Sequence, residues 1–373
     1  MQTTEILELL GFMAPIISGM LCFTLLIAYR LFRKDTPMSV AQLRVMMLYY
    51  VSMVVGWINY ALYRFSPESY VYVNASYYLS LLITQVSSYH LVYMLTGTGS
   101  ENRFRPIHYI IPCALVAVYI VWSFFVPFDV RLLLVTSRGD SITSGYEAYA
   151  LFSTNRIKLR GIYSIVYIIL GIRRYINYKK HITDFSADGG RSSLGWLYML
   201  IVLSVVILPI PLLSLFFSHR QMMTPFLILP HTLILLVQHS ILCYNMLVGN
   251  YVIITKEKPS KHTSKYLTKG IFDLFMNKEK PYLNPELKIT DLTYSLITNR
   301  TYLSEFINRE YGVNFSHYIN RQRLKELDRL RQNHEYDHLS EVELIEMAGF
   351  SSFGAYRWFI NAEKRLNKRP FVN

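Results

Sequence analysis

Charged residues are scarce in this chain of 373 residues. They make up 17% of the sequence, whereas a typical soluble domain has about 25%, and hydrophobic residues reach 52%. This composition excludes an ordinary soluble protein and an intrinsically disordered one. The scarcity is uneven, because the first 250 residues hold 28 charged residues and the last 123 hold 35. We therefore expect a membrane region followed by a water-soluble domain.

Cysteine and the common motifs of catalysis are also scarce. The three cysteines, Cys22, Cys113 and Cys243, lie in separate apolar runs with no CxxC pair, which excludes a disulfide scaffold and disfavours a zinc site. No phosphate-binding loop, zincin motif or nucleophile elbow occurs. We interpret Asp184 and Asp188, next to two glycines, as part of a turn. The sequence therefore predicts no enzyme, no cofactor and no metal site.

Long apolar runs fill the first two thirds of the chain. About 20 apolar residues suffice to cross a bilayer as a helix, and seven runs approach this length, although the fifth is short and weak. The runs span 9–29, 45–63, 74–95, 107–127, 159–175, 194–217 and 223–246. The loops after the first, third and fifth runs hold 11 Lys and Arg, against seven in the other loops. This bias predicts an external N-terminus and, after seven crossings, a cytoplasmic C-terminal segment.

Acidic residues are absent from all seven runs, which disfavours an ion-coupled transporter. Polar residues do occur at membrane depth, on one face of the last run and on one face of the third. They are His231, Gln238 and Asn245, and Tyr78, Gln85 and Ser88. Two interpretations stay open: ordinary hydrogen bonding between packed helices, and a sensor face for a small-molecule or protein signal. We expect the last run to transmit such a signal, since it connects directly to the soluble part.

A basic segment, 248–285, follows the membrane region. It begins with a lysine-rich stretch that suits anionic lipid headgroups. Leu267, Ile271, Leu274 and Phe275 then recur with helical spacing, which predicts an amphipathic helix that pairs with a second copy or packs on its own domain. The expected division is 1–247 for the membrane region, 248–285 for this segment and 286–373 for the soluble domain.

Two segments of the soluble domain have the pattern of helix-turn-helix units. In the first, a short helix at 289–296 precedes a turn with Asn299 as N-cap, and a second helix continues over 300–310 until Gly312. A basic helix at 315–332 joins the units. In the second, Ser340 and Glu343 form a capping box, and a last helix begins near Phe353.

The same residues resemble the DNA-binding domain of the AraC/XylS-type bacterial transcription regulators. The resemblance covers 286–369 and rests on Leu303, Phe306 and Gly312, on the stretch NFSHYINRQRL at 314–324 and on AGFSS at 348–352. It implies that the second helix of each unit enters the major groove of double-stranded DNA. The residues that the resemblance implies to contact DNA are Asn299, Arg300, Thr301, Tyr302, Phe353, Gly354, Arg357 and Trp358. The polar N-terminal turn of the helix at 300–310 adds Ser304 as a candidate, and the basic helix at 315–332 adds Arg321 and Arg323. Ile360-Asn361 departs from the Phe-Lys that the family has there.

The predicted fold is all-α: a seven-transmembrane-helix bundle followed by a cytoplasmic domain with two tandem helix-turn-helix units. The predicted function is a one-component transcription regulator in a bacterial cytoplasmic membrane. Its expected partners are double-stranded DNA, the lipid bilayer, a second copy of the chain and an unidentified signal. The alternative is a seven-helix transporter or receptor whose cytoplasmic tail binds a protein.

Overall fold

Helices account for all the regular structure in the described part of the chain. The computed structural model describes residues 3–32, 38–98, 103–137, 141–208, 225–254 and 267–367, and within these ranges it has no strand, only one isolated bridge between Ser186 and Lys288. The prediction of an all-α protein is therefore confirmed for these residues. The chain divides into two compact units. Unit 1 comprises Met1–Leu95, Asn102–Tyr175 and Gly195–Asn250, and unit 2 comprises Thr96–Glu101, Ile176–Leu194 and Tyr251–Asn373.

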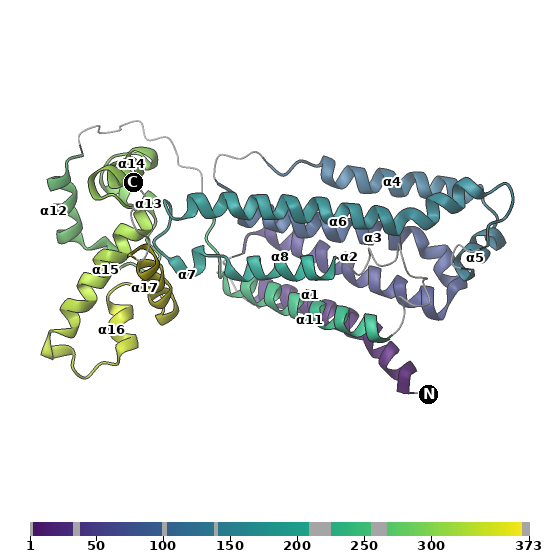
Figure 1. Cartoon of the computed structure of the whole chain (residues 1–373), viewed down its shortest axis with the longest axis horizontal. Helices are drawn as coiled ribbons and strands as arrows, with labels where there is room; N and C mark the ends of the chain where they lie inside the picture. Colours follow the sequence, from purple (N-terminus) through teal and green to yellow (C-terminus); the bar gives the residue numbers. More distant parts are fainter. Residues whose placement is uncertain are drawn as a thin grey trace. The chain divides into compact units, whose positions relative to one another are not determined.

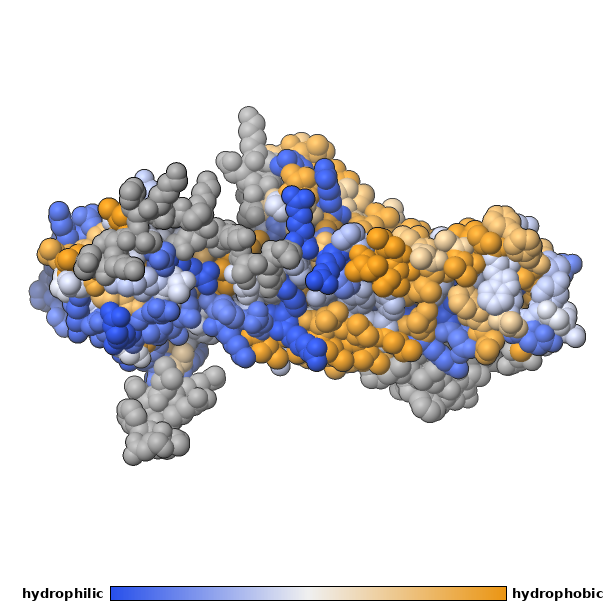
Figure 2. Space-filling model, turned by 90° about the horizontal axis from the view of Figure 1, so that it is seen from above, coloured by the Kyte–Doolittle hydropathy of each residue, from blue (hydrophilic) through white to orange (hydrophobic). Residues whose placement is uncertain are grey.

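Unit 1 is a bundle of long helices, which lie side by side in Figure 1. Its elements are α1 (Thr3–Phe32), α2 (Val40–Phe65), α3 (Pro67–Leu95), α4 (Ile107–Phe124), α5 (Phe128–Thr136), most of α6 (Glu147–Ile182), α8 (Gly195–Ile207) and α11 (Pro225–Val248). Helix α1 packs on α2 and α11, α2 on α3, α3 on α4, and α8 on α11. Figure 2 shows hydrophobic side chains gathered over the surface of this bundle, as expected for helices that face lipid.

Five stretches of described residues are long and apolar enough to cross a membrane. They are Glu5–Phe32, Val40–Phe65, Ile107–Phe124, Gly189–Ile207 and Ile228–Val248. These spans support the assignment to a membrane. The predicted runs at 74–95 and 159–175 are helical but are not among these apolar membrane spans. Serine, threonine and tyrosine are frequent in α3, and basic residues flank the apolar stretch of α6. Residues 209–217 of the predicted run 194–217, with Pro209 and Pro211, lie outside the described residues.

Helix α6 begins earlier than the sequence predicted. Residues 128–158 were expected to form a loop, but α5 lies within this stretch and α6 starts at Glu147. As a result Arg156 and Lys158 lie inside a helix, where apolar and polar residues alternate with helical periodicity. Helix α6 also supplies residues to both units, since its part up to Tyr175 belongs to unit 1 and Ile176–Ile182 to unit 2.

Unit 2 contains shorter helices. They are α7 (Gly189–Ser192), α12 (Lys269–Glu279), α13 (Ile289–Ser295), α14 (Arg300–Tyr311), α15 (Phe315–Arg331), α16 (Glu341–Met347) and α17 (Phe353–Asn367), with single 3-10 turns at Pro281–Leu283 and His334–Tyr336. The predicted helix ends are confirmed. Asn299 caps α14, Gly312 ends it at φ 68°, and Ser340 with Glu343 forms the capping box of α16.

The buried side of α12 differs from the predicted stripe. Phe272 and Met276 are its buried residues, whereas Ile271 and Leu274 are 53% and 69% exposed. Phe272 fixes this orientation, because its ring packs against Phe306, Tyr311 and Tyr318. Of the two packing alternatives for this helix, the structure shows the contact with its own domain, and the apolar pair Ile271 and Leu274 is left on the surface.

Candidate functional site

The segment 183–194, between α6 and α8, is built into the core of unit 2. Phe185 and Ala187 are fully buried. Its backbone bonds to three places in the C-terminal sequence: Ile289 N donates to Phe185 O at 3.0 Å, Ala187 N donates to Leu287 O at 3.1 Å, and Ser316 N donates to Thr183 O at 2.9 Å. The sequence suggested only a turn here. The alternation of buried Phe185 and Ala187 with polar neighbours was the available signal for a strand-like insertion.

Asp188 connects this segment to the start of α17. Its Oδ1 accepts hydrogen bonds from Gly190 N and Arg191 N, which makes it the N-cap of α7. The same oxygen accepts from Ser351 Oγ at 3.1 Å. A Cβ on Gly189 would lie 2.4 Å from Trp358 Cε3, so a glycine is required for the indole to approach this closely. The segment therefore contacts the turn before α17 and a residue of α17 itself.

The first turn of α14 carries most of the predicted DNA contacts of the first unit. Asn299 Oδ1 accepts from Tyr302 N at 2.8 Å, so this side chain is occupied as a cap. Thr301 is exposed, while Tyr302 and Ser304 are half-buried. The opposite face packs inward through Leu303, Phe306 and Ile307.

Arg300 lies beside segment 183–194. Its guanidinium carbon is 5.4 Å from the centre of the Phe185 ring, a cation–π distance. Burial raises the pKa of the Asp184 carboxyl, and the positive charge of Arg300 opposes that rise. The predicted base-reading arginine is thus half-buried and in contact with a residue of segment 183–194, which the sequence gave no reason to expect.

The predicted contacts of the second unit lie on the first turns of α17. Phe353, Gly354, Arg357 and Trp358 are all exposed, with Phe353 at 41% and Trp358 at 39%. The Arg357 guanidinium carbon lies 5.9 Å from the centre of the Phe353 ring. One face of the Trp358 indole lies against Gly189, so only part of this side chain is open to a partner.

The two arginines predicted from α15 occupy different places. Arg321 is exposed and forms an ion pair with Glu363, with Nη2 2.9 Å from Oε1. Arg323 is 1% exposed, and it donates to the carbonyl oxygens of Tyr282, Ala187 and Asn284 and to Asn320 Oδ1. Burial lowers the pKa of the Arg323 guanidinium to about 10, so it stays charged at neutral pH. A guanidinium buried in this way cannot reach a phosphate, and the prediction of a DNA contact by Arg323 is replaced by a structural role.

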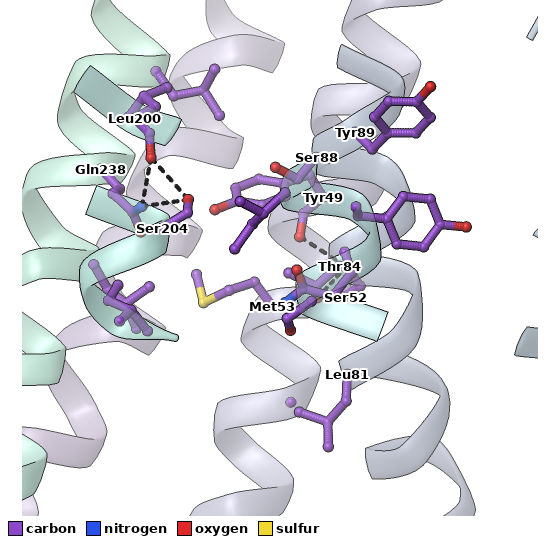
Figure 3. A pocket seen from close by; sticks show the side chains of 18 of the residues that line it. Tyr49, Ser52, Met53, Leu81, Thr84, Ser88, Tyr89, Leu200, Ser204 and Gln238 are labelled. Carbon is purple, nitrogen blue, oxygen red and sulfur yellow. Dashed lines mark hydrogen bonds between the residues drawn. The ribbon is translucent and has the colours of Figure 1, made fainter. Parts of the chain in front are cut away.

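A separate cavity of about 270 Å³ lies within unit 1. Residues of α2, α3, α6, α8 and α11 line it. Four of the six predicted sensor residues do so: Gln85, Ser88, His231 and Gln238. In Figure 3 Gln238 and Ser204 lie on one side of the cavity and Ser52, Thr84 and Ser88 on the other. Gln238 Nε2 donates to Ser204 Oγ at 3.1 Å, and Ser52 Oγ lies 3.0 Å from Thr84 Oγ1.

The other two predicted sensor residues lie elsewhere in unit 1. Tyr78 belongs to a buried cluster with Leu82, Val116 and Tyr119, and Asn245 donates to Ile241 O at the end of α11. The sequence also missed a cavity residue, Arg160, because it lies at the very start of the predicted run 159–175 and was counted with the basic residues of the preceding loop. No protein-family model, curated protein or solved structure matches this chain.

Proposed function

We propose that the chain is a one-component transcription regulator of a bacterial cytoplasmic membrane, with unit 2 as an AraC-type, sequence-specific DNA-binding domain. The observation that carries the proposal is the pair of helices α14 and α17. Each follows a short helix, α13 or α16, and each has exposed residues in its first turns, Thr301 in α14 and Phe353, Gly354 and Arg357 in α17. Helix N-termini with exposed polar side chains suit base edges and phosphates of a major groove.

The proposed topology has the N-terminus outside and unit 2 in the cytoplasm. Besides the five apolar spans, α3 and α6 are proposed to cross the membrane, since at 1.5 Å per residue helices of 29 and 36 residues exceed the roughly 30 Å of hydrocarbon. A cysteine-free chain carrying Ser66→Cys or Glu305→Cys tests this. A membrane-impermeant maleimide should label Ser66→Cys in intact cells and Glu305→Cys only after permeabilisation, and labelling of both in intact cells would contradict the topology.

Two chain connections are proposed to carry a signal to unit 2. The sequence suggested the last apolar run alone, but α6 also continues into unit 2 and leads into segment 183–194. That segment contacts Arg300, through Phe185, and Trp358, through Gly189. A shift of α6 therefore has a direct route to predicted DNA-contacting residues of both helix pairs.

DNA binding is tested with the full chain in lipid nanodiscs at fixed salt. Genomic fragments are selected on the wild-type protein, and the affinity for the best fragment is compared with that for random DNA. Arg300→Ala should cost about 1–3 kcal/mol on the selected fragment and much less on random DNA. The control is Arg309→Ala, an exposed arginine at the other end of α14, which should leave the preference unchanged. Equal affinity of the wild-type chain for selected and random DNA would refute the proposal.

Ile271 and Leu274 are apolar and exposed on α12. Such a pair also favours the alternative function, in which unit 2 binds a protein. Two DNA-binding domains in one complex gain effective concentration on a double site, so we propose that this apolar pair contacts a second copy of the chain. With Leu274→Cys introduced into a cysteine-free chain, bismaleimide treatment of membranes should give a dimer, and Ile271→Asp should abolish it. A crosslink to a different protein instead would favour the alternative.

A further inference from the structure

The cavity of unit 1 has the dimensions of a small-molecule site. Its volume of about 270 Å³ is just below the range of roughly 300–1,000 Å³ that accommodates drug-sized ligands. It extends along α6 from Arg160 to Gly171, which is about 16 Å at 1.5 Å per residue. An elongated ligand smaller than a typical drug would fill it.

Arg160 is the charged residue of the cavity. No lining residue is acidic, and the sequence has no Asp or Glu between Asp188 and Glu257, which covers both α8 and α11. The Nε atom of Arg160 is buried without a hydrogen-bond partner among the described residues. A buried donor without an acceptor costs free energy, more so when the group is charged. An anion in the cavity would remove that cost.

Arg156, one turn earlier on α6, shows that the bundle can satisfy an arginine when the role is structural. Its Nη1 donates to Asn74 Oδ1 at 2.7 Å, and its Nη2 donates to Ser153 Oγ at 3.1 Å. Its guanidinium carbon also lies 4.4 Å from the centre of the Tyr119 ring. Arg160 has no comparable arrangement in the described part of unit 1, although it is on the same helix. Arg156 is therefore a packing residue, whereas the Nε of Arg160 lacks an acceptor among the described residues.

Aromatic side chains surround the Arg160 end of the cavity. Trp57, Tyr60, Tyr77 and His231 line it together with Arg160. Trp57 packs edge-on against Tyr60 and against His231, with ring centres 5.8 and 5.7 Å apart, and Tyr60 stacks on Tyr77. Apolar side chains, including Leu81, Leu200 and Ile201, also line the cavity. This lining suits a flat or aliphatic body attached to the anionic group.

We propose that this cavity binds a small molecule with one carboxylate-like anionic group on an apolar body, the anionic group paired with Arg160 beside Trp57, Tyr60 and His231. Gln85 and Ser88 form no hydrogen bond within the described residues and line the same cavity, so they can bind a second polar group of the ligand. Gln238 holds Ser204 in place and shapes the wall. The site goes beyond the proposed DNA binding and does not depend on it.

Trp57 provides the reporter for a binding test. Tryptophan occurs at 57, 122, 196 and 358, so W122F, W196F and W358F together leave Trp57 alone in the full chain. Bromine quenches tryptophan fluorescence on contact. The probes are 4-bromobenzoate, its neutral amide 4-bromobenzamide and the cationic 4-bromobenzylamine. A second arm uses 8-bromooctanoate and its amide, to separate an aromatic carboxylate from a lipid-derived fatty acid.

The expected result is saturable quenching of Trp57 by at least one carboxylate, with its amide binding roughly 10- to 100-fold more weakly and the amine not saturating. Arg160→Gln should weaken carboxylate binding by the same factor and leave amide binding unchanged. Lys158→Gln, an exposed residue of the same helix, should change neither. A chain that keeps only Trp122, which does not line the cavity, should show no saturable quenching.

If Arg160→Gln does not fold, the arms on the Trp57-only chain that keeps Arg160 still test the proposal. Absence of saturable quenching, or equal binding of carboxylate, amide and amine, would overturn the proposal. Binding of the bromobenzoate alone would identify an aromatic acid, and binding of the bromooctanoate alone a fatty acid. DNA binding plays no part in this test, so its failure and the failure of the regulator proposal are distinguishable.

Discussion

Two arginines, the buried Arg323 and the half-buried Arg160, show how the two units of this chain differ. In unit 2 Arg323 donates to four oxygen atoms from four residues, and its charge is held by the fold itself. In unit 1 the Nε of Arg160 has no acceptor among the described residues, and the side chain lines a cavity. A charged group whose acceptors are all supplied by the fold stabilises the fold, whereas a charged group without them marks a place where a ligand is expected.

The largest effect is expected from Arg323→Met. The substitution keeps the aliphatic volume but leaves the carbonyls of Ala187, Tyr282 and Asn284 without this donor, which should cost about 3 kcal/mol in the free energy of unfolding of unit 2. Denaturant unfolding of the full chain with Trp358 as its sole tryptophan measures it. A loss below about 1 kcal/mol would contradict the structural role.

The helix boundaries of unit 2 were predictable because local signals determine them. Asn299, Gly312 and the Ser340–Glu343 box are caps whose chemistry acts within four residues, and the structure confirms each. Segment 183–194 was not predictable, because its partners, including Leu287, Ile289 and Ser316, lie more than 95 residues further along the chain. The burial of Arg323 was not predictable for the same reason, since one of its acceptors is Ala187.

In unit 1 most of the helices were predictable from the sequence, but the residues that line the cavity were not. Hydrophobic run length located the long apolar helices but missed α5 and the start of α6. It also could not separate Gln85 and Gln238, which line the cavity, from Tyr78 and Asn245, which do not. Which side of a helix faces a neighbour depends on the packing of the whole bundle. Arg160 was missed because a basic residue near a membrane boundary is ordinarily assigned to a loop.

A smaller effect is expected from Gly189→Ala. The added Cβ would lie 2.4 Å from Trp358 Cε3, so the indole must move, at a cost of about 1–3 kcal/mol typical of overpacking. Fluorescence of the chain with Trp358 alone should shift to the red. Gly270→Ala is the matched control, since nothing lies within 4 Å of a Cβ there. An unchanged spectrum in Gly189→Ala would remove the contact between segment 183–194 and α17.

Acid should weaken unit 2 gradually. Hydrogen bonds, first from Arg329 and then from Lys280, lower the pKa of the Glu326 carboxyl below its ordinary value of 4.5. A lowered carboxyl pKa contributes stability that is present above pH 4.5 and lost as the pH falls through the folded-state value. Unfolding of the chain with Trp358 alone between pH 6 and pH 3 measures this slope. Glu326→Gln should flatten it, and an identical slope in this variant would assign the acid sensitivity to other groups.

The smallest effect on stability is expected from Arg160→Met, the counterpart in unit 1 of Arg323→Met in unit 2. Because the buried Nε of Arg160 lacks an acceptor among the described residues, replacement of the side chain by an apolar one should leave thermal stability in detergent unchanged within about 0.5 kcal/mol, or raise it. The measurement is made without added carboxylate, on the full chain with Trp57 as sole tryptophan. A destabilisation as large as that of Arg323→Met would show that Arg160 is structural.

The proposed role as a transcription regulator requires that the membrane-embedded chain bind specific DNA sequences. Its most direct test is a genome-wide map of DNA crosslinked in cells to the full chain, compared with the Arg300→Ala variant at equal protein level in the membrane. We expect a small set of discrete sites for the wild-type chain, with occupancy reduced at every site in the variant. A wild-type map without enrichment over that of a chain lacking residues 267–373 would contradict it.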